Sequence, residues 1–144
     1  MKKLYGALCA LLISSQASAG GLAFMDDSFD KAMVKAKQEN KMVLVYLDSP
    51  KRSVESLFMT GMLFPVHKVG DLYNDRFVSL KQTAGENQEL TKLAEQQGVT
   101  AYPACLILDG NGNVVSKSQG TKDLEEFIEF GQKALSSGDK VAAF

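Results

Sequence analysis

Residues 42–47 form an unbroken run of apolar and β-favouring side chains, Met-Val-Leu-Val-Tyr-Leu. Such a run predicts a strand that is buried on both faces of a sheet. Pro50 ends it, because proline has no N–H to donate and keeps the preceding residue out of the helical region. A helix is predicted over 51–59, since apolar residues recur there at helical spacing, at Val54, Leu57 and Phe58. In α/β folds, the loop between such a strand and helix often carries the chemistry.

The rest of the chain alternates between helical and extended patterns. Amphipathic spacing predicts further helices over 28–40, 66–73, 88–97 and 120–135. Apolar runs predict strands over 77–82, 99–108 and 114–118. Thr60-Gly61 is expected to stop the helix that begins near residue 51, and the Gly- and Asn-rich segment 109–113 predicts a tight hairpin turn.

The order of these elements predicts an α/β fold. A strand–helix–strand unit gives a parallel pair with a right-handed crossover, and the hairpin adds two antiparallel strands. The result is one mixed sheet with helices on both faces, in a single domain over residues 28–135. Residues 20–27 are expected to be a flexible leader and residues 136–144 a frayed C-terminal tail.

The first 19 residues have the pattern of a secretory signal peptide. Two lysines precede an apolar run at 4–13, and Ala17-Ser18-Ala19 supplies the small residues of a cleavage site. A retained membrane anchor is the alternative, but the run is well short of the roughly 20 apolar residues that span a bilayer. We therefore expect cleavage after Ala19 and an exported protein, periplasmic or secreted, with no membrane span after cleavage.

Composition narrows the classes of function. The formal net charge is −1 and the pI about 5.8, with no basic stripe, so nothing favours nucleic acid as a partner. Cys105 is the one cysteine left after cleavage, so it is either buried or kept for pairing with another molecule. His67 is the only histidine, which makes a metal site improbable. We expect no metal and no cofactor.

One segment carries a family resemblance. Residues 98–103, Gly-Val-Thr-Ala-Tyr-Pro, lead into an apolar strand and an Asp-Gly-Asn-Gly turn at 109–112. This resembles the segment of the thioredoxin superfamily in which a cis-proline precedes a strand and hairpin, and the likeness extends over about 28–135. The resemblance implies a three-layer thioredoxin-like sandwich with a central mixed four-stranded sheet. It also implies a cis Tyr102–Pro103 bond.

The chain departs from that family where the family carries its chemistry. The family has Trp-Cys-x-x-Cys after the first buried strand; laid over this chain, the cysteines fall on Arg52 and Glu55 and the tryptophan on Lys51. A one-residue slip is possible, but no register supplies a cysteine. Thiol–disulfide exchange needs a thiolate at a helix N-terminus and a second sulfur to resolve the mixed disulfide.

Two hypotheses of function follow from the resemblance. In the first, an exported and redox-inactive protein of chaperone-like or scaffold type binds a protein or an extended peptide. The residues expected at that groove are Lys51, Arg52, Glu55, Tyr102 and Pro103. The charged residues among them could equally be a solvated helix start. In the second, a thiol–disulfide oxidoreductase-related protein uses Cys105 in mixed disulfides; against this, strand alternation predicts Cys105 to be a small core residue.

Overall fold

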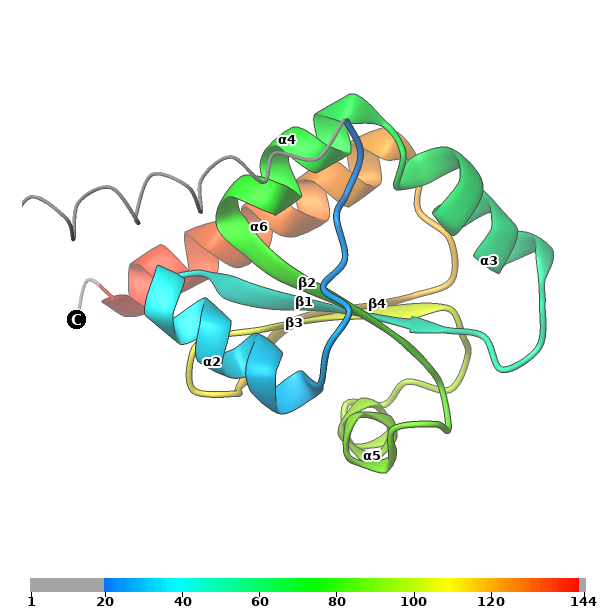
Figure 1. Cartoon of the computed structure of the whole chain (residues 1–144), viewed down its shortest axis with the longest axis horizontal. Coiled ribbons are helices and arrows are strands. Elements are labelled where there is room, and N and C mark those ends of the chain that lie inside the picture. The colour runs from blue at the N-terminus through cyan, green and yellow to red at the C-terminus, as the bar shows by residue number, and fades with distance from the viewer. Residues whose placement is uncertain (1–19, 143–144) are drawn as a thin grey trace, which may run out of the picture.

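The computed structural model describes residues 20–142. Figure 1 shows the elements in chain order. They are α2 (Phe29–Glu39), β1 (Met42–Asp48), α3 (Val54–Phe58), the π-helix η2 (Met59–Leu63), α4 (His67–Arg76), β2 (Phe77–Thr83), α5 (Gln88–Gln96), β3 (Ala104–Leu108), β4 (Val114–Gln119) and α6 (Leu124–Ala142).

The strands form a mixed four-stranded sheet in the order β2-β1-β3-β4. β1 and β2 are parallel, whereas β1–β3 and β3–β4 are antiparallel. The predicted parallel crossover unit and the predicted hairpin are both confirmed. β1 is central because its side chains are apolar on both faces, which is what the run at 42–47 predicts.

Helices cover both faces of the sheet, as predicted. Val43, Val45 and Leu47 point into one core cluster, which α2 and α5 cover. Leu44 and Tyr46 point into the other cluster, which α3, η2, α4 and α6 cover. Figure 1 shows α2 and α5 below the sheet and α4 and α6 above it. The α/β three-layer fold class is therefore confirmed.

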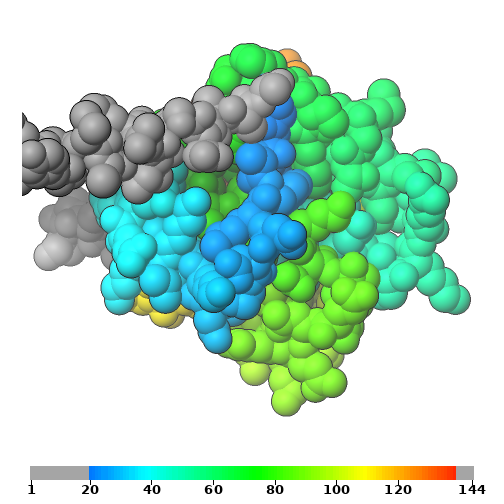
Figure 2. All heavy atoms as spheres, viewed as in Figure 1, coloured from blue at the N-terminus to red at the C-terminus, as the bar shows by residue number. Residues whose placement is uncertain are grey.

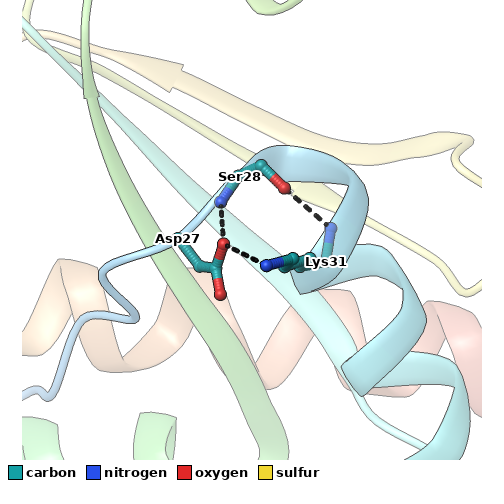
Figure 3. Close-up of polar contacts among 3 residues, drawn as sticks. All are labelled: Asp27, Ser28 and Lys31. Atoms are coloured by element: carbon teal, nitrogen blue, oxygen red, sulfur yellow. Dashed lines mark hydrogen bonds and ion pairs between the residues drawn. The ribbon is translucent and has the colours of Figure 1, made fainter.

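α2 begins at the polar residues that the sequence indicates. The Ser28 hydroxyl accepts a hydrogen bond from the Lys31 N–H at 3.2 Å, which is a helix N-cap. The Asp27 carboxylate accepts from the Ser28 N–H and lies 3.6 Å from the Lys31 ammonium (Figure 3). At the other end Asn40 takes the left-handed conformation and closes the helix.

The helix after β1 differs from its prediction at both ends. α3 begins at Val54 rather than at residue 51, because Ser53 is its N-cap. Thr60-Gly61 does not stop the helix, which continues as η2 to Leu63. Two observations account for this continuation. Met59 and Leu63 are buried and hold the segment against the core, and the Thr60 hydroxyl bonds to a carbonyl of the preceding turn.

The second half of the chain follows the prediction with shifted boundaries. The Tyr102–Pro103 bond is cis, as the resemblance implied. β3 begins at Ala104 rather than at residue 99, because the Thr100 and Ala101 N–H groups donate to the Gln119 side chain instead of a strand neighbour. α6 begins at Leu124 and extends to Ala142, so the residues up to 142 in the expected frayed tail are helical.

Segment 20–27 is not the loose leader expected from the sequence. It runs along α4 and β2 (blue in Figure 2), where Leu22 and Met25 donate main-chain hydrogen bonds to Phe64 and Ser79. A Cβ added to Gly70 would lie 2.0 Å from the Gly20 carbonyl oxygen, so a glycine is needed there for the segment to approach α4. The expected signal peptide, 1–19, lies outside the described residues.

Candidate functional site

Three loops meet at one end of the sheet. In the strand register, Ala104 at the start of β3 lies beside Leu47 of β1 and beside Gln119 of β4. The loop 49–53 after β1, the loop 100–103 before β3 and the loop 120–123 after β4 therefore emerge together. A hydrogen bond of 2.8 Å from the Gly120 N–H to the Pro103 carbonyl joins two of these loops.

Two serine hydroxyls lie together where α3 begins. The Ser53 hydroxyl accepts from the Ser56 N–H at 3.1 Å and donates to the Ser56 hydroxyl at 3.0 Å. Ser56 is only 6% exposed and faces the core from the first turn of the helix. The pair thus occupies positions i and i+3 at a helix N-terminus, with one member at the cap.

A buried tyrosine extends this polar cluster toward the sheet. The Tyr46 hydroxyl donates to the Asp48 carboxylate at 3.1 Å. Burial raises the pKa of Tyr46 far above its ordinary value, and the Asp48 charge adds to the increase, while the Ser56 hydroxyl acts in the opposite direction. Tyr46 therefore stays neutral and acts as a donor under the helix start.

The cis-proline loop presents its main chain at the same end. Pro103 is buried and Tyr102 half-buried. The Tyr102 side chain packs on the core cluster below the sheet, where burial and then the Glu95 charge raise its pKa. Within residues 20–142, the Tyr102 N–H and C=O take part in no hydrogen bond. Its side chain therefore lies on the other side of the sheet from α3, and its two main-chain groups have no partner among these residues.

No family model and no curated protein sequence matches the chain. Among solved structures, it is similar to a candidate disulphide-isomerase from Bacteroides thetaiotaomicron, with 28% identity and a TM-score of 0.71, covering 84% of this chain and 98% of that one. It is also similar to a thioredoxin from Thermus thermophilus (21% identity, TM-score 0.67, covering 82% and 90%). A third similar structure is a DsbH oxidoreductase (16% identity, TM-score 0.60, covering 83% and 88%).

The chain has a thioredoxin-like fold. The resemblance inferred from the cis-proline segment is thereby confirmed. The names of these neighbours are mostly those of redox proteins. Whether this thioredoxin-like chain can perform redox chemistry depends on the side chains in the loops 49–53, 100–103 and 120–123.

The charged residues expected at the site are all on the surface. Lys51 and Arg52 precede α3 rather than lying on it, and Glu55 lies in its first turn. None of the three takes part in an ion pair within the described residues. Arg52 therefore lies outside the helix, with the Ser53 cap between it and α3, and its charge does not act on the helix dipole from a position within the helix.

The helix itself faces the core with a different side from the one predicted. Val54 and Leu57 are exposed, and of the three apolar residues at helical spacing only Phe58 packs against the core. Ser56 and Met59 are the buried residues. Ser53 and Ser56 were not predicted to act as a pair. The signal that could have found them is that serine is a preferred N-cap residue, with the second serine three positions further on.

Cys105 is enclosed by the core above the sheet. Its exposed fraction is 2%, and Tyr46 is its partner across β1 and β3. Burial raises the pKa of the Cys105 thiol to about 12, against a smaller lowering by the Lys122 charge. A protonated and enclosed thiol is a poor nucleophile, which favours the interpretation of Cys105 as a core residue.

The remaining candidates are the single histidine, a metal site and the hollows in the surface. The His67 imidazole is 3.6 Å from the Asp71 carboxylate on the exposed side of α4. In the described part of the chain, no three side chains are arranged to hold a metal ion, and no helix is long and apolar enough to cross a membrane. Two hollows of about 280 and 430 Å³ lie along segment 20–27, with Phe24 and Lys81 lining both.

Proposed function

We propose that this exported, thioredoxin-like protein binds an extended peptide or protein segment without thiol–disulfide exchange. The observation that carries the proposal is the Ser53–Ser56 hydroxyl pair, with 3.0 Å between the two oxygens, at the start of α3. In this assignment the family's two sulfurs correspond to Ser53 and Ser56, one residue further along than Arg52 and Glu55.

The chemistry of the pair supports binding rather than catalysis. Exchange requires a thiolate that attacks and a second thiol that resolves the mixed disulfide, and a serine hydroxyl can do neither. The buried thiol of Cys105 offers no replacement for them. What remains at the helix start are hydrogen-bond donors and acceptors.

The cis-proline loop supports the mode of binding. An extended peptide can add to unpaired main-chain groups as a further strand, and the Tyr102 N–H and C=O are unpaired in the described structure. In this proposal, Lys51, Arg52 and Glu55 line the same groove. Export through the predicted signal peptide 1–19 is part of the proposal.

A reduction assay and a binding assay test this function together. Residues 20–144 should not accelerate the reduction of insulin by dithiothreitol. The same protein should bind fluorescein-labelled, carbamidomethylated insulin B chain saturably, and Arg52→Ala/Glu55→Ala should weaken this binding. A matched control is Glu129→Ala/Lys133→Ala, which removes an exposed ion pair on α6 and should leave binding unchanged.

Two results would contradict the proposal. Turnover of insulin that disappears in Cys105→Ala would support instead the oxidoreductase-related alternative, which the redox names of the neighbours favour. Failure of the B chain to bind the folded protein would remove the binding function.

A further inference from the structure

Three large apolar side chains on the helix after β1 face solvent. Val54 is 79% exposed, Leu57 48% and Met62 68%. In the described residues the only other large apolar side chain exposed to this degree is Val34, which lies by itself on α2. Scattered apolar residues on a surface need no explanation, but a group on one short segment indicates an interaction site.

The backbone of this segment turns the three residues outward. Ser56 and Met59 occupy the inward positions, which leaves Val54 and Leu57 on the solvent side. In a regular α-helix Leu57 and Met62 would be about 140° apart around the axis. The π-turn of η2, closed by a 2.9 Å bond from the Phe64 N–H to the Met59 carbonyl, winds less tightly and brings them closer to one side.

Basic residues adjoin this apolar group. Lys51 and Arg52 lie just before the Ser53 cap of α3, are exposed and take part in no ion pair within residues 20–142. Glu55 is the single acidic residue in α3 and η2. Residues 51–63 therefore carry a net charge of +1, whereas the whole chain has a net charge of −1.

We propose that the surface formed by Lys51, Arg52, Val54, Leu57 and Met62 binds a protein segment in which large apolar residues alternate with acidic ones. The apolar side chains would cover Val54, Leu57 and Met62, and the acidic ones would pair with Lys51 and Arg52. An extended segment fits because the unpaired main-chain groups of Tyr102 lie at the same end of the sheet. This inference rests on the proposed binding function and adds the chemistry of the partner.

Two synthetic peptides of equal length test the partner's chemistry. One repeats Leu-Asp and the other Leu-Lys, and both carry fluorescein for anisotropy measurements on residues 20–144. The Leu-Asp peptide should bind at least about tenfold more tightly at low salt, and the difference should shrink as salt screens the charges. Lys51→Glu/Arg52→Glu should reverse the preference, because it inverts the charge beside the apolar group.

The apolar part of the surface has its own variant and control. Leu57→Ser/Met62→Ser should weaken binding of the Leu-Asp peptide about tenfold or more, because both side chains lose apolar contact with it. Val34→Ser removes a comparably exposed apolar side chain from α2 and should have no effect. Because all the substituted side chains are exposed, circular dichroism should show that each variant keeps the fold of the wild type.

The outcomes separate this inference from the proposed function. Equal affinity for the two peptides, no binding of either, or equal effects of the Leu57/Met62 and Val34 variants would each overturn the inference. Should insulin B chain still bind saturably in those cases, the binding function stands and only the chemistry assigned to its partner falls.

Discussion

At the scale of single residues, the proposed register places hydroxyl oxygens, those of Ser53 and Ser56, where the thioredoxin superfamily has its two sulfurs. Ser53 satisfies the Ser56 N–H and also donates to the Ser56 hydroxyl, so both side chains have a structural use in α3. From the sequence, the positions of the dithiol fell on Arg52 and Glu55, with a one-residue slip left open; the proposed function takes the slipped register, Ser53 and Ser56. This register depends on where the helix begins, and the Ser53 cap shifts that start from residue 51 to Val54.

Restoring the sulfurs tests this register directly. Ser53→Cys/Ser56→Cys should form an intramolecular disulfide, because the two γ-atoms already lie 3.0 Å apart and an S–S bond of about 2.0 Å needs only a modest approach. The oxidised variant of residues 20–144 should show one free thiol after unfolding, that of Cys105, and should reduce insulin in the presence of dithiothreitol. Arg52→Cys/Glu55→Cys is the matched control and should show no such turnover. Equal activity in the two variants would place the register back on Arg52 and Glu55.

At the scale of elements, helical periodicity predicted a helix after β1 but not the side that packs. Val54, Leu57 and Phe58 share helical spacing, yet Ser56 and Met59 face the core. Periodicity identifies residues that share a face, whereas the choice of the buried face depends on partners distant in sequence. Ser56 can be buried because Ser53 and Tyr46 surround it with polar groups.

The contact between segment 20–27 and α4 makes a second prediction. Gly70→Ala should destabilise residues 20–144 by about 1–3 kcal/mol, because its Cβ would meet the carbonyl oxygens of Gly20 and Gly21 at 2.0 and 2.7 Å. Gly61→Ala in η2 meets nothing within 4 Å and should be neutral or stabilising by up to about 1 kcal/mol. Urea denaturation compares the two variants. Equal losses would mean that the Gly70 contact does not hold the segment in place.

At the scale of the whole molecule, local patterns were sufficient for the sheet and its layers. The buried run at 42–47, the hairpin residues and the cis-proline segment predicted the mixed sheet and its helices. The docking of segment 20–27 was not predicted, because Leu22, Phe24 and Met25 are too few to form a periodic pattern. In the structure these side chains pack on the two cores, and main-chain hydrogen bonds and a glycine contact add to them. The position of the Tyr102 side chain was not predicted either: it packs on the opposite side of the sheet from α3.

The core above the sheet makes the stability of the whole fold sensitive to alkaline pH. Tyr46, Tyr73 and Cys105 belong to this one cluster, and burial raises the pKa of all three. In the unfolded chain the thiol titrates near pH 8.5 and the phenols near pH 10. Above those values the unfolded state has lost protons that the folded state retains. The free energy of unfolding should therefore fall as pH rises, by up to about 1.4 kcal/mol per pH unit for each group.

Removing the thiol separates its contribution from those of the tyrosines. The thiol's part of the decline begins near pH 8.5 and is complete at its folded pKa of about 12. Cys105→Ala should therefore remove the decline between about pH 8.5 and 10 and leave the later decline caused by Tyr46 and Tyr73. Urea unfolding of residues 20–144 at a series of pH values measures both. A wild-type stability that stays level from pH 7 to 11 would mean that these groups reach water in the folded protein. An accessible Cys105 would then support the alternative function, in which its thiol forms mixed disulfides.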